Sequence, residues 1–369
     1  MKLPQIVIEF NSKAQSIITR SERGVVAVVL KDDTEEALPM ATYKSLAEVD
    51  FTTMTEENYQ YLKLVFESSL SKVIVVTIPT TEEDYSKALS KLEIYKWNYL
   101  TVPSADAEAS TTISSWIKSQ RTNNKIFKAV LANTNADCEG VINFTTTNIV
   151  STIVEDKVFS AAEYCARIAG IVAGLSLDRS LTYYELTDIV SCDLATDPDE
   201  RVDAGELIVV FDGEKYKIGR GVNSLTETTN DDLKKIKIIE GKDMVLEDIK
   251  TTFEDNYVGR VINDYDNKQN LVAAIISYFR SIEGNVLDIN YENTCSISAE
   301  ANREYLESHG TDTEAMSDVE ILQANTGSNV YLNASIKYVD AMEDLDLQIN
   351  MEGGLGNVKR KSSVKWNLG

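Results

Sequence analysis

The residues best able to do acid–base or nucleophilic chemistry are a single histidine and four cysteines. His309 precedes Gly310 at the predicted end of a helix, where a histidine typically interacts with the last helical carbonyl groups. A Ser-His-Asp or Cys-His site would have to use His309, and no GxSxG motif supplies a serine nucleophile. We therefore expect no catalytic triad.

A short stretch containing two glycines, residues 219–224, resembles the beginning of a dinucleotide-binding loop. It reads Gly-Arg-Gly-Val-Asn-Ser, so the third glycine of that motif is missing. A predicted hairpin precedes it, whereas a dinucleotide loop follows the first strand of a βα unit. The GxxxxGK[ST] motif of nucleotide-binding proteins is also absent. We expect no cofactor at this loop.

Two acidic stretches, residues 193–203 and 263–267, could offer oxygen ligands to a divalent cation. The second lacks the glycine and the final glutamate of an EF-hand, and we expect Asp266 or Asn267 to cap the helix that follows it. The cysteines form no CxxC pair and match no zinc spacing; they are Cys138, Cys165, Cys192 and Cys295. As free thiols they fit a reducing compartment, and we expect no metal site.

Composition narrows the class of protein further. The 369 residues carry 59 acidic and 36 basic side chains, for a net charge of −23. Such a chain repels phosphate backbones, so we expect no nucleic-acid partner. We expect no signal peptide in residues 1–10 and no membrane insertion, because the longest weakly polar stretch, 161–175, is too short for a span and contains Glu163 and Arg167.

Strands and helices alternate in the pattern of residues 25–147. The apolar runs predict strands at 25–30, 72–78, 99–102, 126–132 and 140–144, and the helical periodicities predict helices at 56–68, 82–97 and 105–120. The run 72–78, KVIVVTI, is typical of a strand that is buried on both faces. The alternation predicts an α/β domain with a parallel sheet and helices on its faces.

The second half has a different pattern, which predicts an α+β arrangement. Ser160 and Glu163 form a capping-box pattern before a helix at 161–174 that is rich in small residues. A hairpin is expected at 207–219 around Asp212-Gly213. Helices are expected at 243–256, 267–283 and 298–308, followed by a strand at 330–338.

Each end of the chain carries a strand with one apolar face. Near the N-terminus the apolar positions are Ile6, Ile8 and Phe10, and near the C-terminus they are Leu345, Leu347, Ile349 and Met351. Residues 11–24 form a polar linker that could reach about 45 Å if extended at roughly 3.3 Å per residue. Such strands either complete the edges of the chain's own sheet or add to a sheet of a neighbour.

Several motifs resemble the sheath proteins of contractile phage tails and R-type bacteriocins of Gram-positive hosts. They are Arg-Gly-Val-Asn-Ser-Leu-Thr at 220–226, the stretch 243–249, Tyr-Val-Gly-Arg-Val at 257–261, Asn-Asp-Tyr-Asp at 263–266, and the small-residue helix around 166–170. The resemblance covers nearly the whole chain. It is strong over 161–351 and weak over 25–147.

The resemblance implies a sheath-protein fold with an outer α/β domain, an inner mesh-forming domain and strand-exchanging termini. The segments would be an exchanged strand and linker at 1–24, the outer variable domain at 25–150, the conserved sheath domain at 151–343, the C-terminal exchanged strand at 344–351 and a basic flexible tail at 352–369. The receiving sheet would include residues 330–338 and a strand at 285–290. Arg303, Glu304 and Glu307 would face the tail tube.

The resemblance also implies a function without catalysis. The chain would be a structural subunit, assembled in the bacterial cytoplasm, that polymerises helically around a tail tube and contracts to drive the tube through the target envelope. Its partners would be copies of itself, the tube protein, and baseplate and tail terminator proteins. From the residues alone, an acidic nucleotide- or metal-dependent enzyme on an α/β scaffold remains the alternative.

Overall fold

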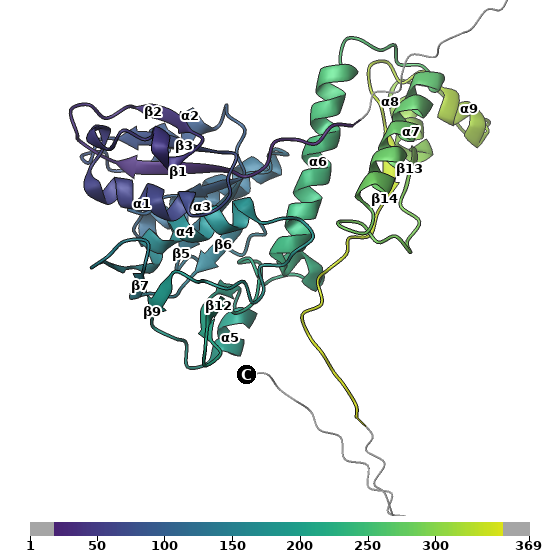
Figure 1. Cartoon of the computed structure of the whole chain (residues 1–369). Helices are drawn as coiled ribbons and strands as arrows, with labels where there is room; N and C mark the ends of the chain where they lie inside the picture. The colour runs from purple at the N-terminus through teal and green to yellow at the C-terminus, as the bar shows by residue number, and fades with distance from the viewer. Residues whose placement is uncertain (1–17, 350–369) are drawn as a thin grey trace, which may run out of the picture.

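The computed structural model describes residues 18–349, and a seven-stranded sheet lies at the centre of its first part (Figure 1). The strand order is β10-β6-β5-β4-β1-β3-β2, and all neighbours are parallel except β2 and β3. The strands are β1 (Val25–Lys31), β2 (Met40–Tyr43), β3 (Lys72–Ile78), β4 (Tyr99–Thr101), β5 (Lys128–Ala132), β6 (Val141–Phe144) and β10 (Glu206–Leu207). The predicted parallel sheet is confirmed.

The sheet is buried on both faces, in keeping with its central strands β1 and β3, which are largely continuous runs of apolar, mostly β-branched residues. Val26 lies opposite Val73 in the parallel register of β1 and β3. Alternate residues of β1 face opposite layers: Val26 and Val28 belong to the core shared with α1 (Glu56–Phe66) and α4 (Ala161–Gly174). Their neighbours face α2 (Ser86–Leu92) and α3 (Ala107–Thr122). Each buried valine contributes about 1.5–3 kcal/mol to folding.

Helix α4 belongs to this α/β domain. The predicted capping box is present, since the Ser160 hydroxyl accepts from the Glu163 amide and Glu163 accepts from the Ser160 amide. Gly170 lets the helix approach α1, because a Cβ there would lie 2.4 Å from the carbonyl oxygen of Val65. The boundary expected at residue 150 therefore falls inside one continuous core, and β10 extends the sheet still further along the chain.

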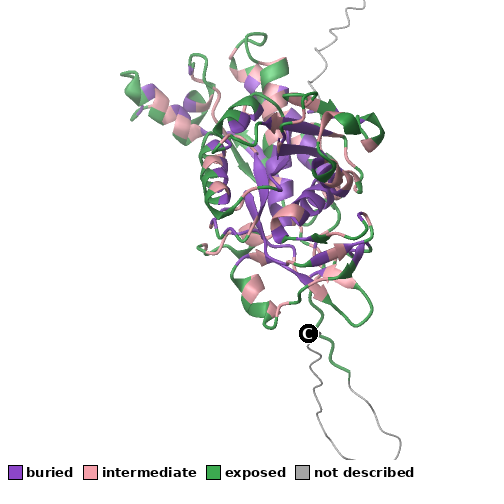
Figure 2. Cartoon of the chain, turned by 90° about the vertical axis from the view of Figure 1, so that its left-hand side faces the viewer, coloured by how far each residue is buried: buried purple, intermediate pink, exposed green. Residues whose placement is uncertain are grey.

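The second part of the chain is built around two long helices, α6 (Ile236–Asn256) and α7 (Tyr265–Ile282) (Figure 1). Helix α7 packs on a two-stranded antiparallel sheet of β13 (Thr294–Ile297) and β14 (Leu332–Ser335). The remaining helices here are α8 (Ala299–Ser308) and α9 (Asp318–Gln323). The apolar core of this part includes Phe279 and Leu287. Figure 2 shows most of the buried residues concentrated around the central sheet, viewed from the α/β end.

Several expected elements are shorter or capped differently. The helix expected at 82–97 is only α2, because the chain turns so that Trp97 can stack on Phe127 at 3.9 Å and donate from Nε1 to the carbonyl of Leu92. Helix α7 is capped by Asp264, whose carboxylate accepts from the Asn267 amide, and neither Asp266 nor Asn267 is the cap.

Two expected strands are also corrected. Residues 285–290 form no strand, because Val286 and Leu287 donate to the Ile282 carbonyl at the end of α7, which leaves Leu287 with isolated bridges only. The strand expected at 330–338 is limited to β14. Within the described residues, the sheet expected to receive the exchanged strands therefore has two strands.

Candidate assembly site

The C-terminal apolar residues lie on the surface of the subunit. Leu345, Leu347 and Ile349 are 80%, 57% and 65% exposed, and residues 344–349 belong to no strand. This segment leaves the body of the molecule as an extended chain (Figure 1). Met351 and the N-terminal set Ile6, Ile8 and Phe10 lie outside the described residues. Exposure of these apolar side chains to water is unfavourable in a lone subunit, and their burial against a partner would be favourable.

The two-stranded sheet of β13 and β14 is the sheet expected to receive an added strand. One face is apolar and packs on α7 through Cys295 and Ile297. The opposite face carries exposed Thr294 and Ser296. In residues 18–349 the two strands pair only with each other. Among the described residues, this sheet therefore has two free edges, each with backbone groups able to pair with an added strand.

Helix α8 carries the residues expected to face a tube. Glu304 and Glu307 are exposed and Arg303 is half-buried. Arg303 donates to the carbonyl of Thr313, and Glu307 accepts from the Thr313 hydroxyl. Two of the three side chains thus hold the loop after α8, and their contact with a tube stays a prediction.

The histidine and the cysteines, which could in principle do chemistry, have structural surroundings in this fold. The ring of His309 stacks on Tyr305 at 4.1 Å, and its Nδ1 lies 2.8 Å from the Tyr305 carbonyl oxygen, which is the helix-end role expected for it. All four cysteines are free, and burial raises the pKa of Cys192 to about 11. Across residues 18–349, no group of three His, Cys, Asp or Glu side chains is placed to hold a metal ion.

The 219–224 loop has a packing role. A Cβ on Gly221 would lie 3.1 Å from the Cβ of Leu181 and 3.2 Å from the amide of Thr182. The Gly221 amide donates to the Thr182 hydroxyl at 2.9 Å, and its carbonyl accepts from Ile236. The glycine is thus required for close backbone approach, and the Gly221 amide that a phosphate could bind already has a partner.

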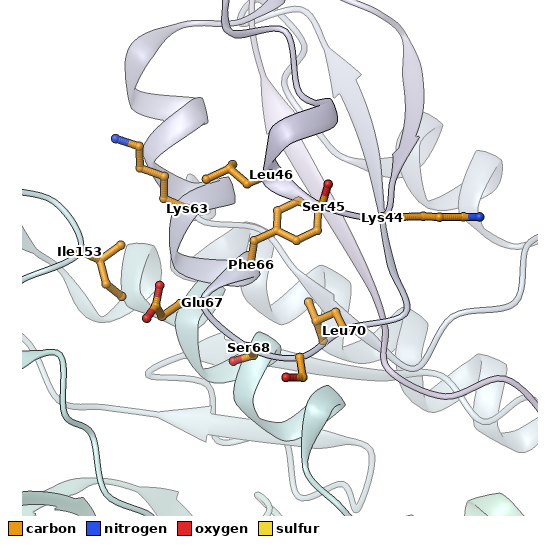
Figure 3. Close-up of a pocket in the computed structure, with 10 residues that line it drawn as sticks. Lys44, Ser45, Leu46, Lys63, Phe66, Glu67, Ser68, Leu70 and Ile153 are labelled. Carbon is orange, nitrogen blue, oxygen red and sulfur yellow. The ribbon is translucent and has the colours of Figure 1, made fainter.

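A surface pocket lies beside the end of α1 (Figure 3). Its lining includes Lys44, Lys63, Phe66 and Glu67. Glu67 is the one carboxylate in this lining, which also contains no histidine or cysteine. No helix among the described residues has the length and apolar composition needed to span a bilayer.

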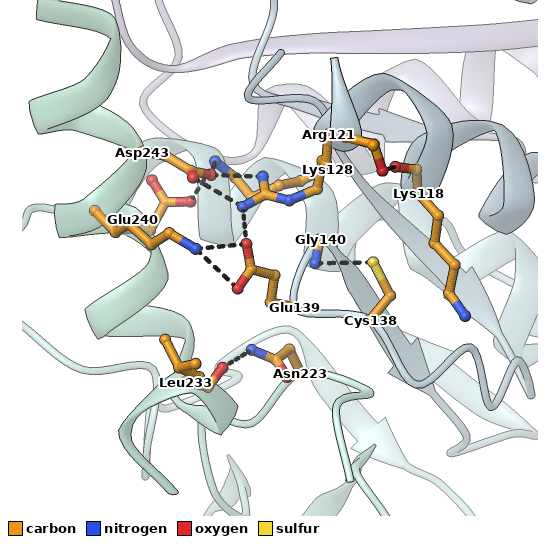
Figure 4. Close-up of polar contacts among 12 residues, drawn as sticks. Lys118, Arg121, Lys128, Cys138, Glu139, Gly140, Asn223, Leu233, Glu240 and Asp243 are labelled. Carbon is orange, nitrogen blue, oxygen red and sulfur yellow. Dashed lines mark hydrogen bonds and ion pairs between the residues drawn. The ribbon is translucent and has the colours of Figure 1, made fainter. Parts of the chain in front are cut away.

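A buried network of charges joins the α/β domain to α6 (Figure 4). Arg121, from α3, donates from both terminal nitrogens to Asp243 of α6 at 2.9 Å. Lys128, from β5, lies 2.9 Å from Asp243 and 3.0 Å from Glu240. Glu139 accepts from Arg121 and from Lys242. Bidentate, charge-assisted contacts of this kind fix geometry as well as adding energy.

The network holds its acids in the charged form. Burial alone would raise the pKa of Glu240, but Lys128, Arg23 and the Tyr99 hydroxyl together lower it to about 2. Glu139 behaves likewise, with burial outweighed by Arg121 and Lys242 so that its pKa falls. The side chains of Lys128 and Asp243 are each only 3% exposed. These buried ion pairs attach α6 to α3 and β5.

This network is absent from the sequence-based expectations. Its contacts to α6 join residues more than a hundred positions apart along the chain. The available signal was a lysine beginning an apolar strand, Lys128, and two acids three positions apart, Glu240 and Asp243, on one face of a helix.

Family models match both parts of the chain. The phage tail sheath protein central domain matches residues 79–224, and the phage tail sheath C-terminal domain matches residues 228–352. The junction between the two matches precedes α6.

Relatives and solved structures agree with these matches. The tail sheath protein of Clostridium phage phiCD119 is 36% identical over 366 residues, covering 95% of this chain and 99% of that protein. The helical sheath of the anti-feeding prophage in its contracted state has a TM-score of 0.69 at 14% identity, covering 95% of this chain and all of that one. The sheath tail protein of Desulfitobacterium hafniense has a TM-score of 0.66 at 18% identity, covering 80% and 94%. With two sheath domains along its length and a full-length relative, this chain belongs to the phage tail sheath protein family and is a structural subunit of a contractile sheath.

Proposed function

We propose that this subunit polymerises helically around a tail tube and that contraction of the polymer drives the tube through a target cell envelope. The family membership and the similarity to the sheath of the anti-feeding prophage support this function. A subunit whose contacts are heterologous and whose rotation does not close forms such a helical polymer.

Strand exchange would link the subunits. Two observations together carry this proposal: Leu345, Leu347 and Ile349 are exposed, and the β13–β14 sheet has two free edges in the described residues. The C-terminal strand of one subunit, and the strand containing Ile6, Ile8 and Phe10 of another, would add to the β13–β14 sheet of a third. Backbone pairing would fix register, and burial of each large side chain would contribute about 1.5–3 kcal/mol.

The remaining roles follow from this arrangement. The α/β domain would lie on the outside of the polymer, and α8, with Arg303, Glu304 and Glu307, would face the tube. The ends of the polymer would meet baseplate and tail terminator proteins. Assembly would take place in the bacterial cytoplasm before release, and the subunit would have no enzymatic activity.

Electron microscopy of the purified subunit tests this proposal. We expect striated tubes or stacked rings from the full chain, and folded monomers from a chain that ends at Glu343. The proposal fails if the truncated chain builds tubes of normal length, or if the full chain stays a compact particle at every concentration.

A further inference from the structure

The segment that leads to the N-terminal strand is held against α6. We call residues 18–23 the N-terminal root. Ile18 is buried in the core around α6 and α7. The Ser21 amide donates to the buried carboxylate of Asp248 at 2.6 Å. Arg20 donates to the sulfur of Met244. The sequence pattern predicts that these residues belong to the polar linker 11–24. In the structure they contact α6 instead of leaving the body of the subunit.

These contacts follow one face of α6. Arg23 forms an ion pair with Glu240, Arg20 contacts Met244, and Ser21 contacts Asp248. Positions 240, 244 and 248 are spaced four residues apart, so they form one row on the helix surface.

The segment that leads to the C-terminal strand is held at the beginning of the same helix. We call residues 339–344 the C-terminal root. Lys237 donates to the carbonyl of Val339 at 3.1 Å, and Lys235 forms an ion pair with Asp340. The Val339 amide donates to the carbonyl of Val286.

The end of the C-terminal root is clamped by the α/β domain. Ser180 and Thr182 each donate a hydroxyl to the same carboxylate oxygen of Glu343 at 2.7 Å. Arg220 lies 3.5 Å from the other oxygen of Glu343 and 2.5 Å from Asp344. The pKa of Arg220 is raised, first by the hydrogen bond to Asp344. The exposed residues begin directly after these contacts, at Leu345.

We propose that α6 is the common anchor of both exchanged strands, with the Arg220 clamp fixing the point and direction at which the C-terminal strand leaves. This inference rests on the proposed strand exchange. The N-terminal root crosses α6 and the C-terminal root leaves near its first turn (Figure 1). From Lys235 to Asp248 the helix rises about 20 Å at 1.5 Å per residue, so each subunit presents its two links at a fixed separation.

Anchoring has a measurable consequence for assembly. Release of the C-terminal root would lengthen the free tether from about seven residues to about thirteen before Met351. The effective concentration of a tethered strand falls roughly as the −3/2 power of tether length, so the critical concentration for polymerisation should rise about two- to threefold. Loss of direction adds to this effect, because a pre-aimed strand loses less freedom on binding.

The test uses the full chain with Arg220→Ala and the matched control Arg201→Ala. Both arginines are about equally exposed, at 38% and 39%, and Arg201 pairs with Glu206 away from both roots. Hydrogen–deuterium exchange on the monomer should show faster exchange at 339–344 in Arg220→Ala alone, with 18–24 unchanged. Sedimentation should show a higher critical concentration for this variant and no change for the control; the rise should stay below the two- to threefold value of a fully released root, because Val339 and Asp340 keep their contacts. Arg220→Lys should restore part of both values.

The N-terminal root is tested independently by Ile18→Ala combined with Arg20→Ala. Exchange should quicken at 18–24, and the critical concentration should again rise. The anchor proposal is overturned if either root variant exchanges at the wild-type rate, or if its root is released while polymerisation is unchanged. These outcomes leave strand exchange standing, which fails only if the chain ending at Glu343 still polymerises.

Discussion

Arg167 and Asp188 form a buried ion pair, with Arg167 Nε 3.2 Å from Asp188 Oδ1 and both side chains about 5% exposed. Asp188 also accepts from the hydroxyls of Ser151 and Tyr164. The pair attaches the small sheet of β8 (Val158–Phe159), β7 (Ile149–Ser151) and β9 (Ile189–Ser191) to α4. The Asp188 carboxylate thus connects the small β8-β7-β9 sheet to helix α4 of the α/β core.

Removing this carboxylate should be strongly destabilising. Asp188→Ala leaves the Arg167 guanidinium buried without its charged partner, which typically costs about 3–5 kcal/mol. Urea denaturation of the monomer measures the loss. The control is Lys215→Ala, which breaks the exposed pair with Glu185 and should change the stability little. Equal losses in the two variants would contradict a structural role for the buried pair.

The charge network at α6 predicts a loss of stability in acid. The pKa of Glu240 is lowered from 4.5 to about 2 in the folded state. Its contribution is therefore complete above pH 4.5 and is lost as the pH falls toward 2. A lowering of this size corresponds to about 3 kcal/mol. Equilibrium denaturation between pH 6 and pH 2 measures it.

Glu240→Gln is the matched variant for this prediction. Glutamine keeps the shape but cannot titrate, so the variant should be less stable at pH 6 and lose less stability on acidification. Some acid dependence should persist, because hydrogen bonds from Thr34, Thr55 and Asn58 outweigh burial and lower the pKa of Asp32 to about 2 as well. Parallel stability curves for wild type and variant would count against the assigned role of Glu240.

How far the sequence predicts this structure depends on the range of the interactions. Helix α4 was predicted to the residue because its capping box and small-residue composition are local. Strand β3 was predicted because its β-branched run is continuous. Strands β7 to β9 were missed because two or three residues are too few for a period. The pairing of Arg121 with Asp243 was not predicted, because these residues are far apart in the sequence and the local pattern does not indicate which distant segments meet.

The close packing of α4 on α1 gives a third prediction. Gly170→Ala would place a Cβ 2.4 Å from the Val65 carbonyl oxygen, which is backbone and cannot move aside cheaply. Overpacking of this kind typically costs about 1–3 kcal/mol, and the fixed neighbour places this site at the upper end. Thermal unfolding measures the effect. Gly213→Ala serves as the control for lost glycine freedom, since φ there is +99° and no atom lies within 4 Å of the added Cβ.

The alternation of apolar and polar side chains along the C-terminal strand gives the last prediction. Leu347 and Gln348 are neighbours that would point to opposite faces once the strand pairs with a second copy. Leu347→Asp would place a charge on the buried face, so it should abolish polymerisation. Gln348→Asp adds the same charge on the polar face and should leave polymerisation nearly unchanged. Both residues are exposed in the subunit, so both variants should fold with wild-type stability. Sedimentation and electron microscopy distinguish them, and equal polymerisation by the two variants would mean that this strand is not paired in the register we propose.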